Sequence, residues 1–152
     1  VLYQRGDGDV RYLIVKSTSG HISFSKGHVE GQETEWETAC REIREETGIE
    51  KLHKTGEFRE SFCCLTEEGK RKQIVYFLAE FEETEVSPVD RELTDVWLLS
   101  LGEALKRINT PEEREILKKA DRLLERAEKA ADRLPERAEK GGGSPERGDT
   151  YE

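Results

Sequence analysis

Methionine is absent from this chain of 152 residues, cysteine occurs three times, and no apolar run approaches the ~18 residues that a bilayer crossing needs. No signal peptide is visible either. The lack of a long apolar run and of a signal peptide argues against a membrane protein. Cys40, Cys63 and Cys64 are odd in number and two of them are adjacent, which is a poor pattern for a disulfide framework. We therefore expect a reducing, cytoplasmic setting.

An excess of positive charge is also lacking. The formal net charge is -9, which argues against a surface that binds long nucleic acid through its phosphates. A small phosphate ligand is still compatible with this charge, because a bound cation can invert the local sign of a site. The sequence thus favours a small-molecule partner.

Length and composition predict one domain with an appendage. We expect a core domain over residues 1–125, a helical extension over 126–140 and a flexible tail over 141–152. Two near-identical blocks, ADRLLERAEKA and ADRLPERAEKG, precede a GGGS stretch of linker composition. The first residues, VLY, resemble the interior of a strand, so we expect the natural start to be missing.

Periodic patterns predict both strands and helices. Strands are expected at 1–4, 12–15, 57–65, 72–81 and 96–99, with a possible short strand at 22–24. Helices are expected after Thr34, Ser100 and Thr110. Glu37 follows Thr34 by three residues and Glu103 follows Ser100 by three, so both pairs have the spacing of a capping box. Because hairpins join most of the strands, we predict an α+β fold, an α/β/α sandwich with a mixed β-sheet.

Three glutamates of the first predicted helix can gather on one face. Glu42, Glu45 and Glu46 stand at i, i+3 and i+4, opposite the apolar residues of the helix, so we expect all three to point away from the core. Like charges so placed repel one another unless a cation is present. Carboxylate oxygens suit the hard cations Mg²⁺ and Mn²⁺. For the three glutamates alone, a solvated acidic face is the better explanation.

The wider spacing favours the metal site. Five residues separate Gly27 from Glu33, and seven more lead to the stretch REIREETGI that begins at Arg41. This pattern resembles the Nudix box, G-x₅-E-x₇-R-E-U-x-E-E-x-G-U with U aliphatic, at every defining position. A chance match by composition has a probability on the order of 10⁻⁵. The resemblance implies a Nudix fold over roughly residues 1–125 and hydrolysis of a pyrophosphate linkage.

The resemblance also implies roles at the metal. Glu45 and Glu46 would be the main ligands of Mg²⁺ or Mn²⁺. Glu42 would be an additional ligand or the base that activates water, and the backbone carbonyl of Gly27 would be a further ligand. Water activated beside the metal, with the phosphates held for in-line attack, is the chemistry that such a site supports.

Four further residues receive supporting or alternative roles. Glu33 and Arg41 would form an ion pair that orients the helix against the preceding loop. Members of the family often place another catalytic carboxylate before a late strand. Glu92 takes that place here, and Asp90 is its rival, so the identity of the base stays open among these two and Glu42.

This sequence resembles one branch of the Nudix family more closely. The stretch GHISFSKGHVE resembles G-x-W-x-F-P-K-G-H-x-E of the diadenosine tetraphosphate hydrolase-like branch. In that branch the lysine and histidine face the phosphate chain and a strand tyrosine lies near the nucleotide. Lys26, His28 and Tyr76 would be these substrate-binding residues. Ser25 replaces the usual proline and Ile22 the usual aromatic residue, which bears on the dinucleotide substrate but leaves the metal site untouched.

We therefore expect a metal-dependent hydrolase of nucleoside polyphosphates, with dinucleoside polyphosphates favoured. The alternatives within the enzymes are a nucleoside triphosphate, an RNA cap or an inositol pyrophosphate. A non-catalytic Nudix-fold binding module is the alternative outside them. Such a module should show substitutions among the glutamates of the box, and this chain has none. The sequence indicates no oligomeric state.

Overall fold

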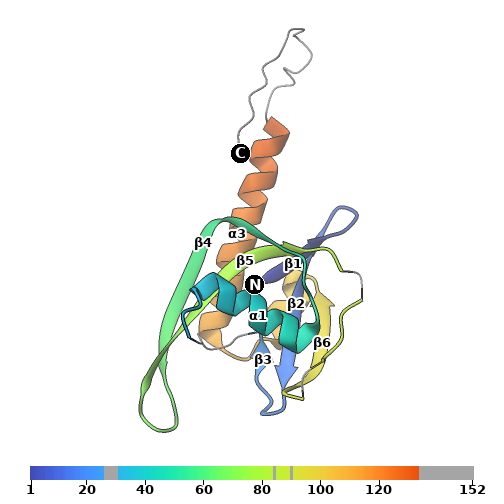
Figure 1. Ribbon diagram of the computed structural model, residues 1–152. Helices are drawn as coiled ribbons and strands as arrows, with labels where there is room; N and C mark the ends of the chain where they lie inside the picture. Colours follow the sequence, from blue (N-terminus) through green and yellow to red (C-terminus); the bar gives the residue numbers. More distant parts are fainter. Residues whose placement is uncertain (26–30, 84, 90, 134–152) are drawn as a thin grey trace. The chain divides into compact units, whose positions relative to one another are not determined.

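The structure is a computed structural model that describes residues 1–25, 31–83, 85–89 and 91–133 (Figure 1). Its elements in chain order are β1 (Leu2–Arg5), β2 (Val10–Ser17), β3 (Ile22–Ser23), α1 (Glu35–Thr47), β4 (Leu52–Leu65), β5 (Arg71–Phe81), β6 (Leu93–Leu99), α2 (Leu101–Arg107) and α3 (Pro111–Arg133). Residues 1–121 form one compact unit, and the described residues from 122 on belong to a second. Among the helices so described, none combines the length and apolar character that crossing a membrane requires.

A six-stranded mixed sheet is the frame of the first unit. Its order is β3-β2-β1-β5-β4, and β6 pairs with β2. Strand β1 runs parallel to β5, with Leu2 opposite Ala79, whereas β1 with β2 and β4 with β5 are antiparallel. The predicted α+β fold with a mixed sheet is therefore confirmed.

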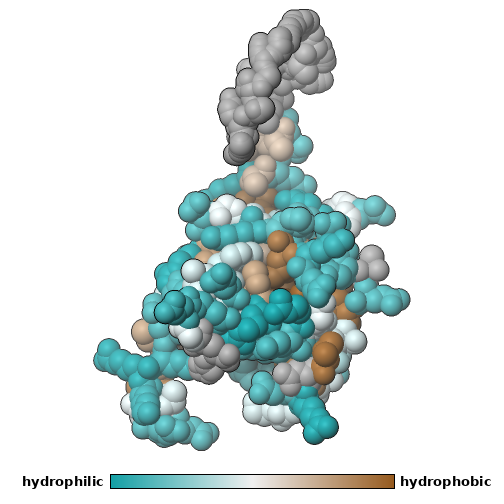
Figure 2. All heavy atoms as spheres, viewed as in Figure 1, coloured by the Kyte–Doolittle hydropathy of each residue, from teal (hydrophilic) through white to brown (hydrophobic). Residues whose placement is uncertain are grey.

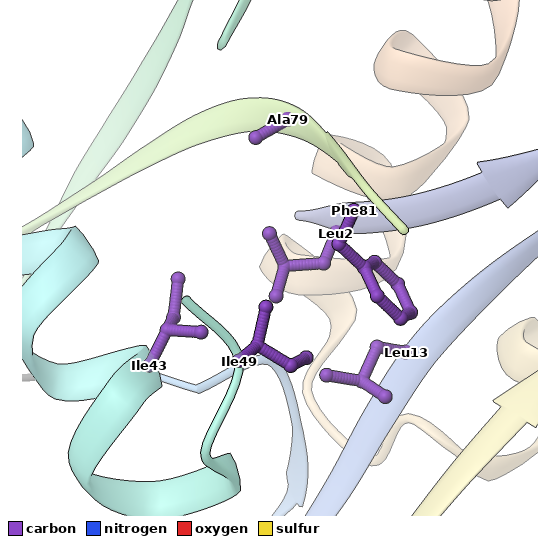
Figure 3. Packing of buried hydrophobic residues seen from close by; sticks show 6 residues of the cluster. All are labelled: Leu2, Leu13, Ile43, Ile49, Ala79 and Phe81. Atoms are coloured by element: carbon purple, nitrogen blue, oxygen red, sulfur yellow. The ribbon is translucent and has the colours of Figure 1, made fainter. Parts of the chain in front are cut away.

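A buried apolar cluster joins α1 to the sheet. Figure 3 shows its members, which come from α1, the segment just after it and three strands: Leu2, Leu13, Ile43, Ile49, Ala79 and Phe81. Removing such side chains from water stabilises a fold by roughly 25 cal/mol per Å² of apolar area. The cluster thus fixes the position of α1, and with it the positions from which the box glutamates extend.

Both ends of α1 are capped. The Thr34 hydroxyl accepts a hydrogen bond from the Glu37 amide at 3.1 Å, and the Glu37 carboxylate accepts one from the Thr34 amide at 2.8 Å. Gly48 ends the helix with φ at 78°, in the left-handed region that favours glycine, and its amide donates to the Arg44 carbonyl. The first capping box is therefore confirmed.

The second predicted capping box is wrong in one half. Ser100 caps α2, since its hydroxyl accepts from the Glu103 amide at 3.3 Å. The Glu103 carboxylate instead lies 3.8 Å from the Lys106 ammonium. A cation one turn along an exposed helix competes with the backbone for this carboxylate, and the spacing of the sequence does not reveal which partner is preferred.

Strand β4 is longer than its sequence pattern indicates. It begins at Leu52 rather than at residue 57, and its pairing with β5 shifts between Lys54 and Arg59. Gly56 lies in this irregular stretch with φ at 55°. The irregularity breaks the alternation of side chains, so the pattern alone misses the first part of the strand.

Hydrophilic side chains cover most of the face shown in Figure 2. Charged residues make up 39% of the sequence, and the formal net charge is -9. An anionic ligand would therefore need local cations or hydrogen-bond donors wherever it binds.

Candidate active site

Arg41 pairs with the carboxylate just before α1. Its Nε lies 2.7 Å from Glu33 Oε2 and its Nη2 lies 3.1 Å from Glu33 Oε1, so the guanidinium and the carboxylate share two hydrogen bonds. The Thr38 hydroxyl also donates to Glu33 Oε1, at 3.0 Å. These contacts tie the segment before the helix to its second turn.

The same guanidinium contacts two glutamates of the box. Arg41 Nη1 lies 2.7 Å from Glu42 Oε1 and 3.0 Å from Glu45 Oε1. The Arg41 side chain is 15% exposed, that of Glu42 18% and that of Glu45 51%. A cation of the chain itself thus offsets the repulsion that the spacing predicts. We call Arg41, Glu33, Glu42 and Glu45 the Arg41 cluster.

Glu46 departs from the expectation that all three glutamates point away from the core. It is only 4% exposed, and the Ser25 hydroxyl donates a hydrogen bond to its Oε1. The reason is its place on α1: it follows the core residue Ile43 by three positions and so lies beside the buried stripe. Its backbone carbonyl accepts from the Val89 amide at 2.8 Å, so the segment before β6 adjoins this end of the helix.

A pocket of about 140 Å³ lies beside Glu46. Its lining comes from β2, β3 and their connection, from α1 and from the start of β6: Val15, Ser17, His21, Ser23, Phe24, Glu46, Glu92 and Leu93. Glu46 and Glu92, which are far apart in sequence, therefore line the same hollow. Glu42 and Glu45 do not line it and are directed to Arg41 instead.

A second carboxylate site lies next to this pocket and was missed by sequence reasoning. Glu113, in the first turn of α3, has a fully buried side chain. The Tyr76 hydroxyl donates to its Oε2 at 2.6 Å, and His21 Nε2 lies 2.9 Å from its Oε1. We call Glu113, Tyr76 and His21 the Glu113 cluster. Burial, and then the hydrogen bond to Glu113, raise the pKa of the Tyr76 hydroxyl well above its ordinary value, so Tyr76 is a neutral donor.

Tyr76, which the sequence assigns to substrate binding, is packed among aromatic rings. It is 3% exposed, stacks on Phe62 with centroids 6.0 Å apart, and meets the edge of Phe24 at 5.7 Å. Phe24 lines the pocket and Tyr76 does not. In this structure Tyr76 thus contacts the pocket residue Phe24 and is linked to His21 through Glu113.

Part of the predicted site lies outside the described residues. These positions are Lys26, Gly27, His28 and Asp90. Within the part of the chain that the structure does describe, no three histidine, cysteine or acidic side chains converge on a point that could hold a metal ion. Glu42 and Glu45 converge on Arg41, while Glu46 shares the pocket with Glu92.

Comparison with known proteins gives a consistent result. The NUDIX domain matches residues 1–120. Two curated relatives are the putative mutator protein MutT4 of Mycobacterium tuberculosis and the asymmetrical bis(5'-nucleosyl)-tetraphosphatase of Mus musculus. The first is 33% identical over 106 residues, which are 68% of this chain and 42% of the relative. The second is 37% identical over 81 residues, which are 51% of this chain and 54% of the relative.

A solved structure extends the likeness to the fold. The binary complex of a C. elegans Ap4A hydrolase matches with a TM-score of 0.76 at 28% identity, over 82% of this chain and 93% of that one. The chain spans about half the length of the two curated relatives above.

Proposed function

Because the chain belongs to the Nudix family, we propose that it is a metal-dependent hydrolase that cleaves a pyrophosphate linkage in a small nucleotide. The predicted family is confirmed by the domain match over residues 1–120. The observation that carries the proposed activity is the pocket that Glu46, a box glutamate, and Glu92 both line. An intact box and a second carboxylate at one pocket favour an enzyme over a binding module.

The donor set suits the divalent ions that Nudix hydrolases generally use. We propose Mg²⁺ or Mn²⁺, held by Glu45 and Glu46, with Glu42 and the Gly27 carbonyl as further ligands. Glu42 and Glu45 contact Arg41 through one oxygen each, and these contacts do not use their second oxygens. When bound, such an ion would lower the pKa of a coordinated water and polarise a phosphoryl oxygen.

Other residues of the chain would supply the base and hold the loop before α1 in position. Glu92 and Glu46 place two carboxylates in the pocket, and we propose Glu92 as a base that accepts the proton of the attacking water, with Glu42 and Asp90 as the rivals. The pair of Glu33 and Arg41 holds the loop before α1 against the helix. Misplaced ligands lose both metal affinity and rate, so this pair acts on the reaction indirectly.

We further propose dinucleoside polyphosphates as the substrate class. The stretch GHISFSKGHVE supports this choice, as do relatives named bis(5'-nucleosyl)-tetraphosphatase and Ap4A hydrolase. Lys26 and His28 would contact the phosphate chain, and Tyr76 would lie near the nucleotide. The relative named as a putative mutator protein keeps a nucleoside triphosphate as the second candidate. The cytoplasmic location and the exclusion of long nucleic acid stay predictions.

A substrate panel tests the proposal. The protein is incubated with Mg²⁺ and, separately, with a dinucleoside tetraphosphate, a nucleoside triphosphate, a capped RNA fragment and an inositol pyrophosphate, and the products are identified by mass spectrometry. We expect the tetraphosphate to be cleaved with the highest kcat/KM, at a phosphoanhydride bond. Preference for the triphosphate would overturn the substrate class. No turnover of any compound, although Mg²⁺ binds, would overturn the enzyme in favour of a binding module.

A further inference from the structure

Ser25 is a position at which this chain departs from the branch of the family that it resembles. The pattern of that branch has a proline here, and a proline side chain has no hydrogen-bond donor, whereas a serine hydroxyl can donate. From the sequence we expect this replacement to leave the metal site untouched. The structure instead shows a contact between the Ser25 side chain and a glutamate of the box.

The Ser25 hydroxyl donates a hydrogen bond to Glu46 Oε1, from a position 21 residues earlier in the chain. Ser25 is half-buried, and Glu46 is 4% exposed. A hydrogen bond to a carboxylate is stronger than one between neutral groups, and exclusion of water strengthens it further. This bond therefore ties the segment after β3 to the last turn of α1.

The contact reaches Glu46 from beside the pocket. Glu46 lines the pocket together with Glu92, whereas Ser25 is not one of the lining residues. The bond engages Glu46 Oε1, and because a carboxylate is planar, it also restricts the direction of Oε2. Ser25 thus restrains the orientation of a carboxylate that the pocket presents to a ligand.

We propose that Ser25 is a positioning residue that orients the Glu46 carboxylate for a divalent cation and so raises the affinity of this chain for Mg²⁺ or Mn²⁺. This inference rests on the proposed function, in which Glu46 is a metal ligand. A carboxylate that is already oriented loses less conformational freedom when the ion binds, so more of the interaction energy appears as affinity. Ser25 does not contact the ion in this proposal and acts only through Glu46.

The alternative is that the bond only joins the segment after β3 to α1 and stabilises the fold. In that case, loss of the hydroxyl lowers the melting temperature of the metal-free protein, but each folded molecule binds the ion as before. A positioning role instead raises the Kd of the ion for the folded protein. The Kd therefore separates the two roles, and it is measured without turnover.

The test compares Ser25→Ala with Ser61→Ala in the full chain. Each variant removes a serine hydroxyl that contacts another side chain, Glu46 for Ser25 and Gln73 for Ser61. The electron paramagnetic resonance signal of free Mn²⁺ gives the Kd. We expect Ser25→Ala to raise it about tenfold, at the low end of measured losses for partners of metal ligands. Ser61→Ala should leave it unchanged.

An unchanged or lower Kd in Ser25→Ala would overturn the proposal. Two further variants show whether the hydroxyl itself is responsible. Ser25→Thr keeps a hydroxyl and should bind Mn²⁺ nearly as well as wild type, whereas Ser25→Pro lacks it and should bind as weakly as Ser25→Ala. Wild-type affinity in Ser25→Pro would assign the effect to the backbone and reject the role of the hydroxyl. Circular dichroism of each variant establishes that the protein measured is folded.

A double-mutant cycle shows whether Ser25 acts through Glu46. Ser25→Ala should have little further effect on the Kd in a Glu46→Gln background, because the ligand that Ser25 orients is already altered. Equal losses in both backgrounds would reject the positioning role alone.

The same titrations keep this inference distinct from the proposed function. Absence of Mn²⁺ binding to the wild-type protein would overturn the proposed metal site and this inference with it. Wild-type binding that Ser25→Ala does not weaken would overturn only the inference. Weaker binding in Ser25→Ala, together with no hydrolysis of any compound in the substrate panel, would support the inference and overturn only the proposed activity.

Discussion

The Arg41 cluster and the Glu113 cluster compensate carboxylates in different ways. In the first, one guanidinium contacts three glutamates that lie on α1 or just before it, and the side chains are partly exposed. In the second, one fully buried carboxylate contacts Tyr76 of β5 and His21 of the connection between β2 and β3. The first cluster follows from the spacing along one helix, whereas the second depends on the folded sheet.

The largest expected effect is a loss of rate when a glutamate of the pocket, and not one of the Arg41 cluster, is changed. Glu46→Gln should lower kcat by at least ~10²-fold, because it removes a charged oxygen from the proposed metal site. The amide retains the shape of the buried side chain, so the fold should persist. Steady-state rates at saturating Mg²⁺, with circular dichroism of the same samples, give the measurement. The matched control is Glu50→Gln, at an exposed position just after the helix, which should keep its rate. Near wild-type turnover in Glu46→Gln would end the proposed metal role.

The second effect tests whether Arg41 is the internal cation of its cluster. Arg41→Ala leaves Glu33, Glu42 and Glu45 without their shared partner, and we expect the free energy of unfolding to fall by about 2 kcal/mol, less than for a fully buried pair because these groups are partly solvated. Urea unfolding measures this loss of free energy of unfolding. The control is Arg59→Ala, which breaks a two-bond pair with Glu35 between exposed side chains. A loss no larger than in this control would show that the Arg41 cluster contributes little.

A metal titration sharpens the same comparison. Millimolar Mg²⁺ should raise the melting temperature, because the ion binds the folded arrangement of Glu42, Glu45 and Glu46; at ten times the Kd the stabilisation is about 1.4 kcal/mol. The shift should be smaller in Glu45→Gln, whose remaining glutamates bind more weakly. A melting temperature that does not respond to metal would count against the metal site. Differential scanning calorimetry measures the shift of the melting temperature, with chelator-treated protein as the reference.

The sequence predicted what local spacing determines. The α+β fold, the mixed sheet and the first capping box follow from periodicity and capping residues, since each depends on positions a few residues apart. The family follows from a motif of the same local kind, and the domain match confirms it. The start of β4 was missed because a register shift interrupts its alternation.

The environment of the carboxylates could not be predicted in the same way. Glu46 lies beside the buried stripe of α1, and the segments at Ser25 and Val89 adjoin it there. The sequence has no local signal for these two contacts. The burial of Glu113 had a weak local signal in the sequence. It stands three and seven positions before Ile116 and Ala120, which are buried, so it begins the apolar stripe of α3. An acidic residue at the head of such a stripe indicates a buried hydrogen-bonded carboxylate.

The smallest expected effect compares two helix starts that look alike in sequence. Glu37 completes the capping box of α1, whereas the Glu103 side chain turns toward Lys106. Glu37→Ala should therefore destabilise the protein by about 0.5 kcal/mol, at the low end of measured cap losses, because the Thr34 amide loses its acceptor. Glu103→Ala loses only an exposed ion pair, which contributes about 0.3 kcal/mol or less. Urea unfolding of both variants beside wild type can resolve the difference if the midpoints are measured in parallel with a common slope. Equal losses would mean that the cap at α1 exchanges with solvent as freely as the pair at α2. The capping box would then mark where the helix begins without stabilising it.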